Sequence, residues 1–242
     1  MLLQAVWTSL TLSTLALAGA ARAAVLQQTT HVAQRLLYYQ VVLPDNFDPN
    51  RAYPTILAFG GGPQSMEVVQ RTVERTFRVQ AEKRGYIVVV PAAPPGQLFF
   101  ESGARIFPEF LQQILASYKV ESRKFLAAGA SNGGTSAFHI AALYPEYFRS
   151  ITAFPGYLPE PTPARVSAIA GMCIHMFVGQ LDELGFEKPM QQDAEIFRRR
   201  GIALTYSVEQ GQPHRIETLA GDGAARLFDL FDADRERCAR AD

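Results

Sequence analysis

The sequence has no excess of charge of either sign, since 23 Lys and Arg residues balance 23 Asp and Glu residues in a chain of 242. It also lacks the clusters of Lys and Arg that binding to nucleic acid or to an anionic membrane surface would need, so we expect no nucleic-acid partner. The 48% content of hydrophobic residues is ordinary for a globular protein. This length is enough to bury one sizeable core.

Cysteine is also scarce, with only Cys173 and Cys238 present. The four histidines are scattered singly, and no Cys/His spacing is typical of a zinc site, so we expect no metal site. In an exported protein the two cysteines could form a disulfide. The sequence leaves open whether they do so or remain separate thiols, because it does not give the distance between them.

The first 21 residues contain no charged side chain, and a run rich in Leu and Ala ends near Ala20. Ala21-Arg22-Ala23 fits a small-residue cleavage pattern, which predicts a signal peptide over residues 1–23 and a mature domain over 24–242. We therefore expect a periplasmic or secreted protein. No Lys or Arg precedes the run, so an uncleaved anchor is the alternative. The run is polar for a membrane span, however, and no stable membrane insertion is expected.

Strand-like and helix-like segments alternate along the rest of the chain, which is typical of a mostly parallel sheet with helices on both faces. The expected fold is a three-layer α/β sandwich in a single domain. Residues 155–172, between two expected strands, leave no room for a large cap. The expected strands are 36–43, 53–59, 86–90, 124–129, 151–154, 173–178 and 203–208, and the expected helices are 66–83, 107–118, 132–147, 187–200 and the tail after His214.

Gly129-Ala130-Ser131-Asn132-Gly133 carries the clearest chemical signal. It matches G-x-S-x-G, in which small flanking residues allow a sharp turn between a strand and a helix and expose the serine hydroxyl. The expected strand before it and helix after it supply that context. We therefore predict that Ser131 is a catalytic nucleophile.

A serine nucleophile needs a base. In α/β sandwiches that carry G-x-S-x-G, the acid and then the histidine follow the serine in the chain. His31 precedes Ser131, His139 lies on the helix of the nucleophile, and His175 lies inside an apolar strand. His214 follows a late strand in the loop Gln210-Gly211-Gln212-Pro213, which favours it as the base.

The acid is expected after the strand 173–178, where Asp182 and Glu183 stand next to each other. We favour Asp182, which would orient the imidazole and stabilise its protonated form. Glu183 would then be a solvated carboxylate of the same loop.

The oxyanion hole of such a site uses two backbone N–H groups. One belongs to Asn132, and the other to the loop Gly60-Gly61-Gly62, where Gly61 is our first choice. Possible apolar substrate contacts are Phe99, Phe100 and Leu181, in an open cleft. Phe99 and Phe100 could equally pack inside their own loop.

Together these residues resemble the polyhydroxybutyrate-depolymerase-like and feruloyl-esterase-like bacterial branch of the α/β-hydrolases. Leu43-Pro44, Tyr53-Pro54, the Gly60–Gly62 loop and the Gly129–Gly134 turn carry the resemblance, with Asp182 and His214 further on. The resemblance implies hydrolysis of carboxylic esters without a cofactor. One difference is that Phe59 stands where the branch usually has a histidine, so no ring hydrogen bond supports the glycine loop.

The sequence therefore predicts an exported serine esterase acting on a small-molecule or polymer-linked ester. Two alternatives remain open: a serine peptidase of the same fold, and a non-catalytic binding protein. The complete set of Ser131, Asp182 and His214 argues against the second.

Overall fold

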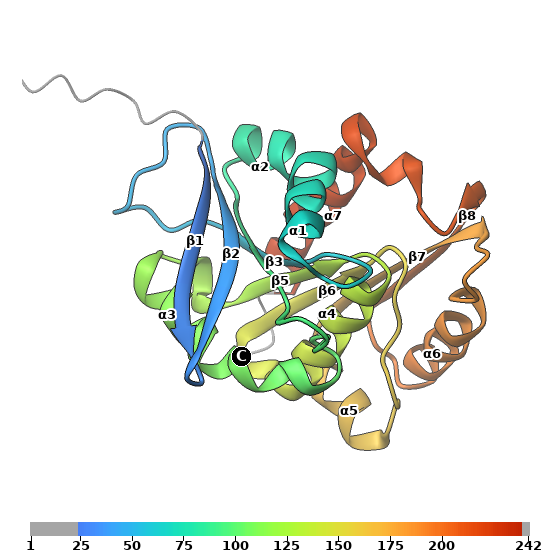
Figure 1. The fold of residues 1–242 in the computed structure, drawn as a ribbon. Helices are drawn as coiled ribbons and strands as arrows, with labels where there is room; N and C mark the ends of the chain where they lie inside the picture. The colour runs from blue at the N-terminus through green and yellow to red at the C-terminus, as the bar shows by residue number, and fades with distance from the viewer. Residues whose placement is uncertain (1–23, 239–242) are drawn as a thin grey trace, which may run out of the picture.

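The computed structural model describes residues 24–238, which build one eight-stranded sheet between two layers of helices (Figure 1). The predicted signal peptide lies outside the described residues. The sheet has the order β1-β2-β4-β3-β5-β6-β7-β8. Its strands are β1 (Ala24–Val32), β2 (Arg35–Leu43), β3 (Thr55–Phe59), β4 (Ile87–Pro91), β5 (Phe125–Gly129), β6 (Phe148–Ala153), β7 (Cys173–Leu181) and β8 (Leu204–Pro213).

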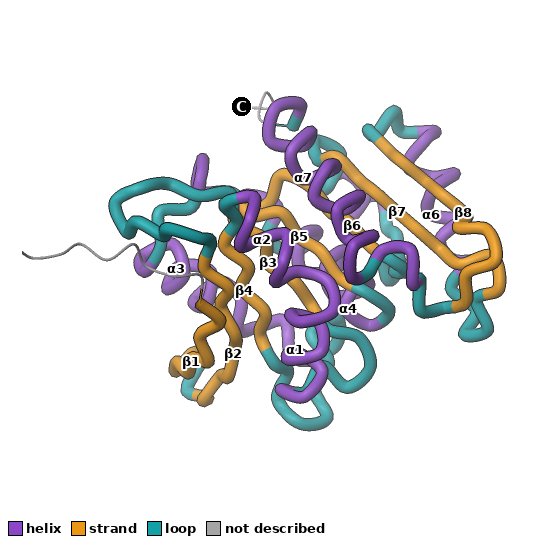
Figure 2. The backbone as a smooth tube through the Cα atoms, turned by 90° about the horizontal axis from the view of Figure 1, so that it is seen from above, coloured by secondary structure: helices purple, strands orange, loops and turns teal. Residues whose placement is uncertain are grey.

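Strand direction brings the site together. β1 and β2 form an antiparallel hairpin, and β2 runs antiparallel to β4. All the other neighbouring pairs, from β4 through β8, are parallel. Figure 2 shows these strands seen from above. The carboxyl ends of β3 and β5 to β8 therefore meet at one edge, where ligands usually bind in open α/β sheets.

The helices cover the two faces of this sheet. In Figure 1, α1, α2 and α7 lie above the sheet and α3 to α6 below it. Side chains of β3 alternate between the two cores, because Leu57 and Phe59 pack with α3 and α4 while Ile56 and Ala58 pack with α1 and α7. The helices are α1 (Met66–Thr72), α2 (Arg78–Arg84), α3 (Phe107–Ser117), α4 (Asn132–Leu143), α5 (Pro163–Ala168), α6 (Glu187–Arg199) and α7 (Ala225–Arg237).

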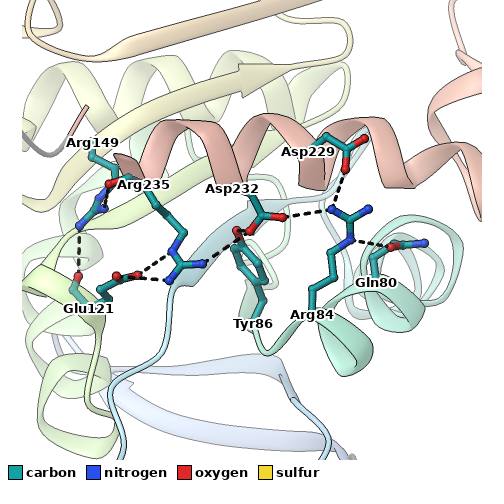
Figure 3. A network of polar contacts seen from close by, with 8 residues as sticks. All are labelled: Gln80, Arg84, Tyr86, Glu121, Arg149, Asp229, Asp232 and Arg235. Carbon is teal, nitrogen blue, oxygen red and sulfur yellow. Dashed lines mark hydrogen bonds and ion pairs between the residues drawn. The ribbon is translucent and has the colours of Figure 1, made fainter. Parts of the chain in front are cut away.

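A polar network fixes the last helix to the sheet (Figure 3). Arg84 contacts Asp229 and Asp232 of α7 at 2.7 and 3.1 Å, and the Tyr86 hydroxyl donates to Asp232 at 2.6 Å. Arg235 donates to Glu121 at 2.8 Å. About two turns of α7, from Asp229 to Arg235, are therefore tied by polar side chains to the segments around Arg84 and Glu121.

Cys173 and Cys238 form a disulfide with a Cα–Cα distance of 6.0 Å, which answers the question that the sequence left open. Beside it, the buried His175 ring contacts Asp234 at 2.9 Å. The bridge thus joins the start of β7 to the end of α7.

The predicted α/β architecture is confirmed, and the structure refines its details. The helix expected over 66–83 contains a π-helical turn, η1 (Val73–Phe77). β1 and α5 had not been predicted. β8 continues to Pro213, so the residues before His214 are strand rather than the flexible loop we expected. Between β6 and β7 lies only the short helix α5, which agrees with the absence of a large cap there.

Candidate active site

Ser131 sits on a strained turn between β5 and α4. Its φ and ψ are 58° and −127°, a conformation that costs a non-glycine residue about 1–3 kcal/mol and is found mainly at functional sites. The turn is held by the Ser131 N–H, which donates to the Pro155 carbonyl at 2.7 Å. A Cβ on Gly133 would lie 2.1 Å from the Phe59 carbonyl oxygen, so only glycine permits α4 to begin so close to β3.

The glycine loop lies directly against this turn. β3 and β5 are parallel neighbours in which Phe59 pairs with Gly129, so the residues following each strand emerge side by side. A Cβ on Gly61 would lie 3.4 Å from Cβ of Ser131. Asn132, the first residue of α4, does not itself line the pocket described below, but its Nδ2 donates to the Gly62 carbonyl at 2.9 Å.

Gln64 supports the glycine loop from beneath, a role that sequence reasoning missed. Its side chain has no exposed surface and a left-handed backbone with φ of 55°. Nε2 donates to the Gly60 carbonyl at 3.1 Å and to the Ser136 hydroxyl at 3.0 Å, while Oε1 accepts from the Phe99 N–H at 3.0 Å. Gln64 therefore provides side-chain hydrogen bonding at a loop where Phe59 offers none.

Pairing of parallel strands also brings Asp182 and His214 together, at the carboxyl ends of β7 and β8. Leu181 of β7 pairs with Pro213 of β8, and each catalytic candidate is the next residue. Oδ2 of Asp182 lies 2.7 Å from Nδ1 of His214. Oδ1 of Asp182 accepts from the N–H groups of Leu184 and Phe186 at 2.9 and 3.3 Å, so the carboxylate is held on both oxygens.

Glu183 also contacts His214, but its carboxylate bonds to the backbone of the histidine and not to the ring. The His214 N–H donates to Oε2 of Glu183 at 3.1 Å, and this hydrogen bond lowers the pKa of that exposed carboxyl. The Phe186 ring packs against the imidazole with a centroid distance of 4.8 Å. The structure thus places Asp182, not Glu183, on the imidazole, and it adds Phe186 as a neighbour that the sequence had not suggested.

Ser131 and His214 line one pocket with a volume of about 410 Å³, which Gly61 also borders. Nε2 of His214 is buried and has no hydrogen-bond partner among the described residues, so it is not bonded to the Ser131 hydroxyl. Catalytic hydrogen bonds are often long or misaligned until substrate binds. The pocket can therefore supply a nucleophile, a base with its orienting acid, and oxyanion donors.

The predicted substrate contacts lie elsewhere. Phe99 has no exposed surface and packs in the core against Phe59 and Phe107, so its prediction as a pocket residue was wrong. Neither Phe100 nor Leu181 lines the pocket. Its apolar walls are instead formed by Val68, Phe154, Leu184, Ile216 and Leu219.

The other three histidines do not line the pocket. His139 is buried on α4, and desolvation followed by the nearby Arg165 lowers its pKa to about 4. His175 is a hydrogen-bonded core residue, and His31 is exposed on β1. Cys173, Asp234 and Cys238 are the one group of candidate metal ligands among the described residues, but the disulfide removes both thiolates.

Residues 104–216 match the family model described as "Putative esterase". A thermostable esterase of known structure superposes with a TM-score of 0.67 at 16% identity, covering 88% of this chain and 62% of that one. A ferulic acid esterase gives a TM-score of 0.66 at 17% identity, covering 88% of this chain and 98% of that one. The protein therefore has the α/β-hydrolase fold. Within that fold it resembles esterases, feruloyl esterases among them, as the sequence predicted.

Among curated proteins, dipeptidyl-peptidase 5 of Porphyromonas gingivalis is 32% identical over 128 residues, which are 48% of this chain and 19% of that protein. The chain thus spans about a fifth of that relative's length. No helix within residues 24–238 combines the length and apolar character needed to cross a bilayer.

Proposed function

We propose that the protein is a serine esterase that hydrolyses carboxylic esters through an acyl-enzyme. The observation that carries this proposal is the 2.7 Å contact between Asp182 and His214 at the pocket that also exposes Ser131. A serine hydroxyl becomes an effective nucleophile when an oriented imidazole accepts its proton.

In the proposed cycle, Oγ of Ser131 attacks the ester carbonyl while Nε2 of His214 takes the hydroxyl proton. The N–H groups of Gly61 and Asn132 stabilise the oxyanion, and Asp182 stabilises the imidazolium. The protonated His214 then gives its proton to the departing alcohol. Water repeats the attack on the acyl-enzyme and releases the acid.

Export of the enzyme is part of the same proposal. The Cys173–Cys238 disulfide supports it, because such bridges persist mainly in oxidising compartments such as the periplasm or the cell exterior. N-terminal sequencing of the protein recovered outside the cytoplasm should begin at Ala24. Recovery of the chain with Met1 retained would contradict cleavage.

A serine peptidase is the second candidate, and the similarity to dipeptidyl-peptidase 5 favours it. The two activities are separated by one panel of 4-nitrophenyl esters of increasing acyl length beside dipeptidyl 4-nitroanilides. We expect ester hydrolysis that Ser131→Ala abolishes and little release from the anilides. Faster Ser131-dependent cleavage of the anilides would instead establish the peptidase.

A further inference from the structure

Three arginines stand along the walls of the pocket that holds Ser131. Arg71 and Arg75 project from one face of α1 and η1, together with Val68. Arg215 lines the same pocket from a different segment, directly after His214. Three positive side chains from two separate segments thus border one cavity.

The carboxylates near them do not cancel this charge. Arg75 and Arg215 share one partner, Glu217, and Arg71 pairs with Glu67 on the same helix. Three guanidinium groups therefore meet two carboxylates. Neither glutamate borders the cavity, nor does any other acidic residue of the described chain. Hydrogen bonding from Arg75 lowers the pKa of Glu217, so the shared partner stays ionised.

The interior of the pocket has a different character. Its apolar lining includes Ala130, which precedes Ser131, and the buried side chains of Phe154 and Ile216. Arg215 is 69% exposed and Arg71 63% exposed, so their charged groups stay in contact with solvent while lining the cavity. An apolar interior with a cationic rim suits a ligand that has an apolar chain and an anionic end. Guanidinium groups bind carboxylates well because both are planar and can form two parallel hydrogen bonds.

We propose that this pocket selects esters carrying a carboxylate remote from the scissile bond, recognised by Arg71, Arg75 and Arg215. The inference rests on the proposed esterase function. The apolar chain would lie against the walls beside Ser131, and the carboxylate would replace solvent, or compete with a glutamate, at the arginines. Arg75 and Arg215 are the best placed to share it, since two guanidinium groups there have only Glu217 between them.

The test compares mono-4-nitrophenyl adipate with 4-nitrophenyl methyl adipate. The second compound has the same chain, with a methyl ester in place of the carboxylate. Wild type should favour the anionic ester by about tenfold in kcat/KM, and each of Arg71→Gln, Arg75→Gln and Arg215→Gln should reduce that ratio about threefold. Added salt should reduce it as well. Arg199→Gln is the matched control, because Arg199 is 69% exposed on α6, across the sheet from α1, and should leave the ratio unchanged.

A binding measurement separates this proposal from the esterase proposal. Ser131→Ala is titrated with monomethyl adipate and dimethyl adipate by NMR, and the monoester should bind more tightly until Arg215 is replaced. If neither nitrophenyl ester is hydrolysed, the esterase function is overturned. The binding preference would still decide the role of the arginines. A wild-type ratio at or below one, or a ratio unchanged in all three arginine variants, would overturn the carboxylate proposal.

Discussion

Leu181 and Pro213 are paired in neighbouring parallel strands, so Asp182 and His214 leave the sheet side by side although they are 32 positions apart in the chain. A Cβ on Gly179 would lie 2.1 Å from the Pro213 carbonyl oxygen, so this close approach depends on glycine. The contact between acid and imidazole is thus set by strand register. The same principle places the glycine loop beside Ser131 at the ends of β3 and β5.

Asp182→Asn should reduce kcat for a 4-nitrophenyl ester by roughly 10⁴, because the amide no longer holds the required imidazole tautomer or stabilises its cation. Glu183→Gln should reduce kcat far less, because the Glu183 side chain accepts from the backbone N–H of His214 and is not bonded to the ring. The amide oxygen of the new glutamine can still accept this hydrogen bond. Circular dichroism of both variants checks folding. A larger loss in Glu183→Gln than in Asp182→Asn would show that the acid has been misassigned.

Gln64→Leu should lower kcat more than it raises KM, because the glycine loop loses the contacts that set its position. It should also lower stability by roughly 1–3 kcal/mol, since the buried Gly60 carbonyl and Phe99 N–H lose their side-chain partner. Steady-state kinetics and urea unfolding measure the two effects. Gln112→Leu, at an exposed position on α3, is the control, and equal kinetic losses in the two variants would refute the positioning role.

We predict that the free energy of unfolding depends on pH because of Asp193. It is buried on α6, and desolvation raises the pKa of its carboxyl to about 7, although the Leu158 N–H donates to it at 2.6 Å. A group with a raised pKa in the folded state favours folding most below its unfolded value. This contribution is lost as pH rises from about 4 through about 7, by roughly 4 kcal/mol at most.

Asp193→Asn keeps the acceptor for Leu158 without the ionisation, so its stability should change less over this pH range than that of wild type. Urea unfolding at several pH values measures the difference. Asp222→Asn, at an exposed position, is the control for the substitution itself. An unaltered profile in Asp193→Asn would mean that the carboxyl does not titrate there.

Reduction of the Cys173–Cys238 disulfide should destabilise the protein by about 4 kcal/mol, the chain-entropy value for a bridge spanning 65 residues. Thermal unfolding with and without dithiothreitol measures this loss. Esterase activity at low temperature should persist, because Cys173 begins β7 and Asp182 follows its opposite end. A Cys173→Ser/Cys238→Ser variant should match the reduced protein and show no response to the reductant.

The sequence could predict those features of the site that depend on local pattern and chain order. Ser131 follows from the glycines around it, and His214 from being the only histidine after the late strands. Gln64 could not be found in this way, because its three partners are distant in sequence or belong to the backbone. Phe99 was wrongly predicted to contact substrate, because the sequence does not distinguish an apolar loop residue that faces a ligand from one that packs in the core.

Long-range pairing explains the remaining differences. Gln210-Gly211-Gln212-Pro213 has the composition of a loop, yet pairing beside β7 makes it the end of β8. The disulfide likewise depends on how α7 lies on the sheet, where Arg84, Tyr86 and Glu121 hold it. Neither outcome is encoded within a window of neighbouring residues.

The most direct test of the account is covalent labelling of Ser131 by a fluorophosphonate, followed by intact mass and peptide mapping. We expect one adduct, located on Ser131, that is absent from Ser131→Ala and forms far more slowly in His214→Ala and Asp182→Asn. Failure of the folded wild-type protein to react, or an adduct on another residue, would contradict the assignment of Ser131 as the nucleophile.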